Sequence, residues 1–370
     1  MKRLPLFDEK FSEKTLRPQI QRIAKLVFDE RQSVTQPGWL TGMAGLAVFS
    51  AEYQAWHKPI HAITPYTTIL QNILSLIDRG FSFPSFAAGL AGIHWTFKYL
   101  GQRNFISHEE AQALSPLIPY IMKWAQTQQE NHNHDILHGS LGPLYAIARA
   151  ELQFGPCPHT HNPPVGHITD LGLAHGILGQ ALAKNQAQQN DIIDDLRYLL
   201  SQADWSMRQG SVFPTKIVDG KPIFPSRMAW CYGDPGIGIA LMQLETDYEE
   251  LKGAGERVLT LAATRRDPEN TRVDDPFICH GSAGLALIFF KGWLLSNNDK
   301  LREAARYWTK ATIEFLEEVR GPKSGVRSPK SGDGMNDWPV SVLDGLSGIG
   351  LVLMAIDQGH LPGWEKGLFI

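Results

Sequence analysis

The chain has 370 residues, of which 43% are hydrophobic and 20% are charged, and its formal net charge is −3. This is the composition of a globular protein, and so balanced a charge argues against a surface for nucleic acid. No run reaches the roughly 18 apolar residues of a membrane span, and the first residues lack the apolar stretch of a secretion signal. We therefore expect a cytoplasmic protein that is not integral to a membrane.

Seven copies of the pattern G-x-x-G, each followed by an apolar helical run, organise the chain. The first glycines of the copies, in chain order, are Gly42, Gly89, Gly139, Gly176, Gly233, Gly281 and Gly345. One such pattern has no meaning, but seven at quasi-regular spacing predict a repeat architecture. Two glycines at each helix start allow neighbouring backbones to approach closely.

Amphipathic stretches with a helical period lie between the copies. They occupy residues 67–80, 109–130, 190–205, 248–265 and 299–319. Their charges share one face, which predicts outer helices, whereas the G-x-x-G helices are apolar nearly all round, which predicts inner helices. We predict an all-α fold, an α/α toroid of about seven helical hairpins with inner and outer rings. Without a linker in the sequence, residues 1–370 are expected to form a single domain.

Two segments depart from this helical pattern. Residues 154–170 are rich in proline and histidine, so the hairpin between copies three and four is expected to be degenerate. Residues 211–226 predict a small β-hairpin, because Asp219-Gly220 suits its type I′ turn.

The residue just before each first glycine should face one end of the central cavity, because equivalent positions of a closed ring converge there. These residues are Thr41, Ala88, His138, His175, Tyr232, His280 and Asp344. Cys231 and the Cys279-His280 pair open neighbouring repeats five and six. Two sulfurs and one nitrogen suit zinc and leave its fourth position open. The spacing by itself also allows two buried thiols beside a hydrogen-bonded histidine.

Three motifs give the sequence a resemblance to a known family. "WCYG" at 230–233, "CHGSAG" at 279–284 and "GLAHG" at 172–176 resemble the lanthionine synthetase C (LanC) family, the cyclases of lanthipeptide biosynthesis. The seven repeats extend the resemblance over nearly the whole chain, and the length favours a stand-alone cyclase. The resemblance implies Zn²⁺ as the cofactor and a set of site residues: the zinc ligands Cys231, Cys279 and His280, the acid/base His175, and the further catalytic residues Asp135, Arg227 and Tyr232.

The implied reaction adds a peptide cysteine thiol to a dehydroalanine or dehydrobutyrine of the same peptide. A free thiol has a pKa near 8.5, so the metal would supply the thiolate, and His175 would return a proton to the α-carbon of the enolate. Asp135 would orient or charge an imidazole, and Arg227 would donate to the enolate oxygen or hold Asp135. The implied partners are a dehydrated precursor peptide and the dehydratase and transporter of its pathway, which would hold the enzyme at the membrane surface.

Several alternatives remain open at this point. His175 can be a buried histidine bonded to a carbonyl, Asp135 a helix cap, and Arg227 part of a salt bridge that orders the hairpin. A related enzyme could instead add glutathione or another thiol to dehydroamino acids in proteins. A toroidal binding protein with a structural zinc is a third possibility, and a carbohydrate enzyme a fourth. The loop "CPHTH" at 157–161 and the pair His132 and His134 are weak metal candidates.

Overall fold

The structure is a computed structural model of the chain, which describes residues 4–58, 65–147, 168–187, 192–244, 248, 251–318, 335 and 338–370. The proline- and histidine-rich loop with "CPHTH", and with it Cys157 and most of the predicted degenerate hairpin, lies outside these residues. Within them, no helix combines the length and the apolar composition that crossing a membrane takes.

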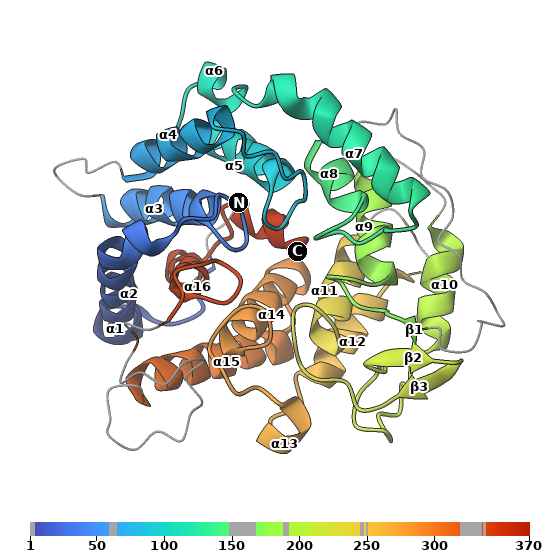
Figure 1. Cartoon of the computed structure of the whole chain (residues 1–370). Helices are drawn as coiled ribbons and strands as arrows, with labels where there is room; N and C mark the ends of the chain where they lie inside the picture. Colours follow the sequence, from blue (N-terminus) through green and yellow to red (C-terminus); the bar gives the residue numbers. More distant parts are fainter. Residues whose placement is uncertain are drawn as a thin grey trace.

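Each of the seven G-x-x-G patterns opens one helix of an inner ring. The inner helices are α3 (Met43–His57), α5 (Leu90–Gln102), α8 (Leu141–Ile147), α9 (Ile177–Gln186), α11 (Asp234–Leu244), α14 (Ser282–Ser296) and α16 (Leu346–Gln358). Each packs against the next in this order, and α16 packs against α3. The ring is therefore closed (Figure 1), which confirms the predicted toroid.

Amphipathic helices cover the inner ring from outside. They are α2 (Arg17–Glu30), α4 (Pro65–Asp78), α7 (Ile118–Glu130), α10 (Ile193–Ser201), α12 (Ala254–Ala262) and α15 (Asp299–Glu318). The outer helix α15 buries a stripe of residues three or four apart, such as Leu301, Ala305 and Trp308, whereas the inner helix α14 is buried along most of its length. This is the contrast between amphipathic and all-apolar helices that the sequence predicts.

Two outer helices, α7 and α12, begin later in the chain than predicted, and the outer helix α2 was not predicted. The stretch 109–130 is not one helix but the short α6 (His108–Ala111), a 3-10 turn and α7, because Pro116 and Pro119 each begin a new segment. Helix α12 begins only after Gly253, which has a positive φ of 73°. The partner of the last inner helix, α16, is α2 from the start of the chain.

The second glycine of every pattern is required by a close backbone contact. A Cβ atom at this position would lie between 1.9 and 2.3 Å from the carbonyl oxygen six residues earlier, in all seven repeats. At Gly348, for example, it would meet the oxygen of Val342 at 1.9 Å. The loop before each inner helix thus folds back over the helix start, which only glycine allows.

These loops are joined around the ring by backbone hydrogen bonds from one repeat to the next. In chain order the bonds run from Leu40 N–H to Ala87 O (2.9 Å), Ala87 to Leu137 (3.0 Å), Ala174 to Cys231 (2.9 Å), Trp230 to Cys279 (3.1 Å), Cys279 to Leu343 (3.2 Å) and Leu343 to Leu40 (3.1 Å). We call this circle the loop ring. Between repeats three and four the Leu137 N–H instead donates to the side chain of Asp135, at 2.7 Å.

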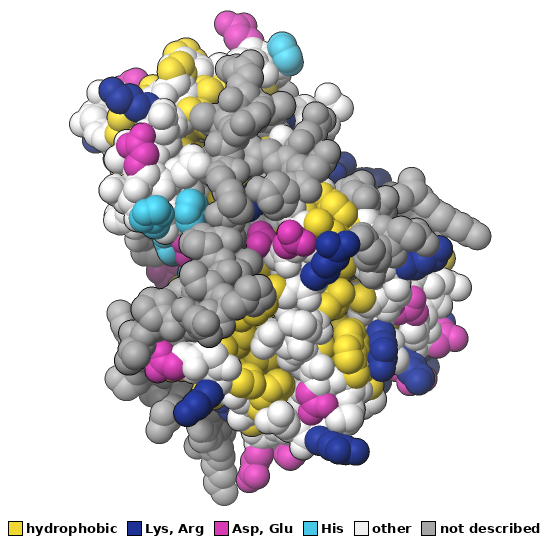
Figure 2. Space-filling view, turned by 90° about the vertical axis from the view of Figure 1, so that its right-hand side faces the viewer, with side chains coloured by type: hydrophobic (Ala, Val, Ile, Leu, Met, Phe, Trp, Pro, Cys, Tyr) yellow, Lys and Arg dark blue, Asp and Glu magenta, His cyan; other side chains and the backbone are white. Residues whose placement is uncertain are grey.

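A small antiparallel sheet lies beside repeats four and five. Strands β2 (Lys216–Val218) and β3 (Lys221–Ile223) form the predicted hairpin, with Asp219 and Gly220 at φ values of 50° and 74°. A third strand, β1 (Ile168–Thr169), pairs with β2 and was not predicted. On the face that carries α10 and the sheet, acidic and basic side chains are interspersed (Figure 2).

The last described residues fill the middle of the ring (Figure 1). The 3-10 helix Trp364–Leu368 presents its carbonyl groups to indole N–H groups of two loops. Trp39 donates to Gly367 O and Trp230 donates to Leu368 O, each at 2.8 Å. This contact ties the loop that carries "WCYG" to the centre of the molecule.

Candidate functional site

The loop ring brings two cysteines of neighbouring repeats together. Cys231 and Cys279 each stand two residues before a first glycine, and both side chains are buried. Because the Trp230 N–H donates to the Cys279 carbonyl, the two loops run side by side at this point. The sulfurs therefore meet inside the ring, although 48 residues separate them in the chain.

His280 completes a group of three donors. One ligand atom from each of Cys231, Cys279 and His280 lies within 4.8 Å of the others, and in the described residues this is the one such group of histidine, cysteine and acidic side chains. Cys279 Sγ and His280 Nε2 are 3.5 Å apart. A tetrahedral zinc bound to one sulfur and one nitrogen would hold them about 3.5 Å apart, so the donor set fits that metal.

The electrostatics of the cysteine pair point the same way. A hydrogen bond from Cys279 and the nearby His280 lower the pKa of the Cys231 thiol to about 6, against the opposing effect of burial. The same shared proton, together with burial, raises the pKa of Cys279. Two neighbouring buried sulfurs thus favour sharing one proton, and a bound cation would favour the ionisation of both.

A second cluster lies where the loop ring lacks its backbone bond. His175 Nδ1 lies 2.5 Å from Asp135 Oδ2, and the other oxygen of Asp135 accepts the N–H groups of Leu137 and His138, both at 2.7 Å. Asp135 therefore closes a turn of its own loop, ahead of α8 and not at the first turn of that helix as the helix-cap alternative had it, and it also binds the imidazole. His138 stacks beside His175, with ring centroids 6.1 Å apart.

The carboxylate controls the proton affinity of His175. The hydrogen bond to Asp135 raises the pKa of His175, despite partial burial. Burial pushes the pKa of Asp135 upward, but the hydrogen bond from His175 and those from the two peptide N–H groups hold it below its ordinary value. With Nδ1 bound to a carboxylate, the imidazole keeps Nε2 for a partner. Among the residues that the structure describes, His175 is bonded to this carboxylate and not to a carbonyl, the alternative that the sequence left open.

The two clusters are neighbours in space. Ala174, the residue before His175, donates its N–H to the Cys231 carbonyl at 2.9 Å. A Cβ atom on Gly172 would lie 2.6 Å from that same carbonyl, so the "GLAHG" and "WCYG" loops are packed together. The negative charge of Cys231 also contributes to the raised pKa of His175. The two clusters therefore lie side by side in the loop ring.

The two remaining predicted residues lie near His280. The rings of Tyr232 and His280 are 6.2 Å apart. Arg227 donates to Asp274 at 2.7 Å. A hydrogen bond to Cys231 raises the pKa of His280, and the charge of Arg227 opposes that rise. In the described part of the chain Arg227 has no bond to Asp135, so the prediction that it holds Asp135 is wrong; the salt bridge is the interaction formed. Its buried Nε has no hydrogen-bond acceptor there.

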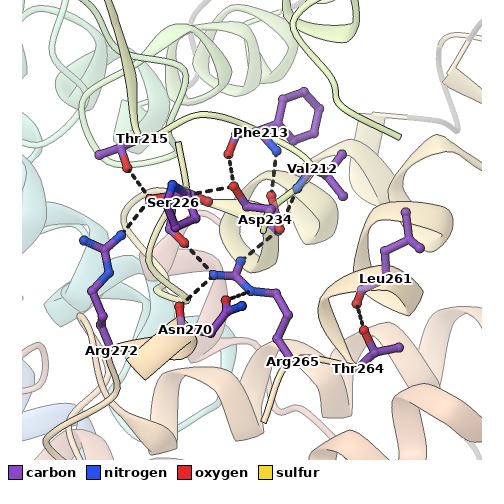
Figure 3. A network of polar contacts seen from close by, with 12 residues as sticks. Val212, Phe213, Thr215, Ser226, Asp234, Leu261, Thr264, Arg265, Asn270 and Arg272 are labelled. Carbon is purple, nitrogen blue, oxygen red and sulfur yellow. Dashed lines mark hydrogen bonds and ion pairs between the residues drawn. The ribbon is translucent and has the colours of Figure 1, made fainter. Parts of the chain in front are cut away.

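A buried ion pair that the sequence analysis missed fixes the start of α11. Asp234, three residues after Cys231, accepts the N–H groups of Val212 and Phe213 and pairs with Arg265 at 3.0 Å (Figure 3). Arg265 also donates to the Ser226 carbonyl, directly before Arg227, at 2.6 Å. Both charged side chains are almost fully buried. The network therefore fixes both ends of the loop that carries Arg227 and Cys231, at Ser226 and at Asp234.

Comparisons with known proteins agree on one family. The sequence model described as "Lanthionine synthetase C-like protein" matches residues 148–368. The "Nisin biosynthesis protein NisC" of Lactococcus lactis subsp. lactis is 25% identical over 226 residues, which cover 56% of this chain and 49% of NisC, so the match spans about half the length of that relative. A solved structure titled "Nisin cyclase" has a TM-score of 0.67 at 20% identity and covers 95% of this chain and 96% of its own, which shows the shared fold.

Proposed function

The chain belongs to the lanthionine synthetase C-like family, and on this premise we propose that it is a zinc-dependent cyclase of dehydrated lanthipeptide precursors. The observation that carries the proposal is the meeting of Cys231, Cys279 and His280 beside the hydrogen-bonded pair of Asp135 and His175. One cluster suits the activation of a thiol, and the other suits the transfer of a proton. Residues 1–370 would form the single domain that does both.

The reaction is the addition of a cysteine S–H across the double bond of dehydroalanine or dehydrobutyrine. A bond forms between sulfur and the β-carbon, the π electrons move to the carbonyl oxygen as an enolate, and a proton is placed on the α-carbon. The product is a (methyl)lanthionine thioether ring. It is an isomer of the substrate, so no leaving group and no oxidant are needed.

The cysteine cluster serves the thiol. Cys231, Cys279 and His280 would hold the zinc ion, which when bound lowers the pKa of a thiol that reaches its open position. The two cysteines form the buried side of the site, whereas His280 is half-buried, so a peptide would enter on the side of His280. Tyr232, next to the His280 ring, would border that entrance.

The Asp135–His175 pair serves the α-carbon. Asp135 keeps the imidazole oriented through Nδ1 and raises its pKa, so that Nε2 holds the proton that the α-carbon receives. The guanidinium of Arg227 would donate to the enolate oxygen as charge develops on it. Its ion pair with Asp274 would keep that guanidinium in place.

The direct test offers the purified protein a synthetic peptide with one cysteine and one dehydroalanine. Ring closure leaves the mass unchanged, so the assay measures the loss of a free thiol by alkylation and mass spectrometry. We expect thiol loss with wild-type protein, and none with Cys231→Ser or after chelation of the metal. A peptide without cysteine, offered with glutathione, is the control; if only this peptide reacts, the enzyme adds external thiols and does not cyclise.

A further inference from the structure

In the part of the chain that the structure describes, the outer ring is open between α2 and α4, away from the site described above. Helix α2 packs on α16, and α4 packs on α3, so the outward face of α3 lies between them (Figure 1). A groove of about 1160 Å³ follows this opening. This volume exceeds the roughly 300–1,000 Å³ of typical small-molecule pockets.

One helical stripe from each of three helices lines the groove. On α3 the lining residues recur three or four positions apart, from Met43 at the first residue through Leu46 and Ser50 to Tyr53 and His57. Lining residues of α2 and α4 show the same spacing. From Met43 to His57 the groove is about 21 Å long, at 1.5 Å per helical residue. A groove of this length matches a helix of about four turns.

The floor of the groove is apolar and its rim is basic. Phe28, Met43, Tyr53 and Leu76 are only partly buried there, although they would be covered in a fully closed outer ring. The charged residues that line it are Lys25, Arg31 and Arg79. Among the described lining residues there is no carboxylate, and within the described chain none of the three basic residues forms an ion pair.

We propose that this groove binds an acidic, amphipathic helical segment of the precursor peptide, outside the part that is cyclised. An apolar stripe at positions i, i+3, i+4 and i+7 would lie on the floor, and glutamates or aspartates beside it would meet the basic rim. This inference rests on the proposed cyclase function for the identity of the partner. The groove and its charge are properties of this chain.

The groove ends on the side of the ring where the site lies, so a peptide bound in it would be held close to the site. Met43, at one end of the groove, begins α3 directly after Gly42, and this is the end of the inner helices at which the loop ring lies and at which, in other repeats, both clusters lie. A peptide held by one segment in the groove would therefore present its remainder near the site. Such tethering raises the effective concentration of the reacting part without any new contact to it.

The test measures binding separately from chemistry. The probe is a fluorescein-labelled peptide of about 15 residues with leucines on one helical face and glutamates on the other; a second probe has lysine in place of every glutamate. We expect fluorescence anisotropy to show binding of the acidic probe only. The variant Lys25→Glu/Arg79→Glu should bind the acidic probe about tenfold more weakly. The charge-matched control Lys123→Glu/Lys221→Glu should bind it as wild type does, because it changes exposed residues of α7 and β3.

Circular dichroism and metal content of both double variants establish that they are folded. Equal binding of both probes, or equal binding to wild type and the groove variant, would overturn the proposal. So would a wild-type dimer in sedimentation that Lys25→Glu/Arg79→Glu dissociates, because a second copy would then occupy the groove. The thiol-loss assay with a peptide that lacks an acidic segment tests the cyclase function on its own, so the two proposals fail separately.

In that assay, fusing the acidic segment to the same dehydrated peptide should lower KM for the wild-type protein. This advantage should be absent from Lys25→Glu/Arg79→Glu and present in the control variant. A fused peptide with unchanged KM in the wild type would show that the groove does not serve the substrate.

Discussion

The junction of repeats five and six and the junction of repeats three and four use the same scaffold for different chemistry. At the first, the loop ring keeps its backbone bond, from Trp230 to Cys279, and the side chains are buried sulfurs. At the second, that bond is replaced by Asp135, which takes the Leu137 N–H and reaches His175. The intact junction therefore forms a closely packed donor set, and the interrupted one forms a half-exposed acid–base pair.

The difference shows how a repeat protein builds a site from few changes. The residue two positions before each first glycine is mostly buried, and the next one faces the more exposed end of the ring. Cysteine at the buried position of two repeats, with His280 beside one of them, gives a group that could hold a metal ion, and histidine at the exposed position of another repeat gives the imidazole that Asp135 binds.

The largest effect on zinc content and activity is expected when a sulfur is removed from the intact junction. Cys279→Ser should abolish bound zinc and reduce thiol loss to the uncatalysed level, because two remaining donors are too few for a zinc site. Metal analysis by mass spectrometry and the thiol-loss assay measure the two effects. Full zinc content together with full activity in this variant would contradict the assignment.

The matching change at the interrupted junction is His175→Ala. We expect cyclisation to slow by about 10²–10⁴-fold, the usual contribution of a general acid–base group, while zinc content stays near one per chain. The contrast with Cys279→Ser is the informative result. Loss of zinc from His175→Ala would place this histidine in the metal site instead.

The buried ion pair beneath the intact junction predicts a loss of stability. Arg265→Met leaves Asp234 charged and without its partner, which should lower the free energy of unfolding by about 3–5 kcal/mol. Urea denaturation followed by circular dichroism measures it. Exposed Arg197→Met on α10 is the matched control, with an expected change below about 0.5 kcal/mol, and equal effects of the two substitutions would show that the pair has no special role.

The smallest predicted effect is a shift in pH dependence from Asp135→Asn. The raised pKa of His175 keeps its proton to a higher pH, and the hydrogen bond to Asp135 is the largest cause. Without the carboxylate that pKa falls, so the alkaline decline of the rate should move to lower pH. A pH–rate profile of wild type and Asp135→Asn tests this direction, and an unmoved alkaline limb would exclude His175 as the acid.

The sequence alone is enough to predict the toroid and to name the cysteines and histidines that the structure brings together in two clusters. Seven glycine pairs could be read directly, because a close backbone contact at each helix start excludes every side chain. Cysteine and histidine next to those glycines could be assigned to the central site, since a closed ring brings equivalent positions together.

The partners of the charged residues around the site follow from the tertiary structure and not from the sequence pattern. The pairing of Arg227 with Asp274 and of Asp234 with Arg265 joins segments tens of residues apart, and no local period or spacing specifies such contacts. The same is true of α2, which covers α16 from the other end of the chain and so leaves the groove over α3 open. Local sequence fixes which face of a helix is apolar, but the closure of the ring fixes what that face meets.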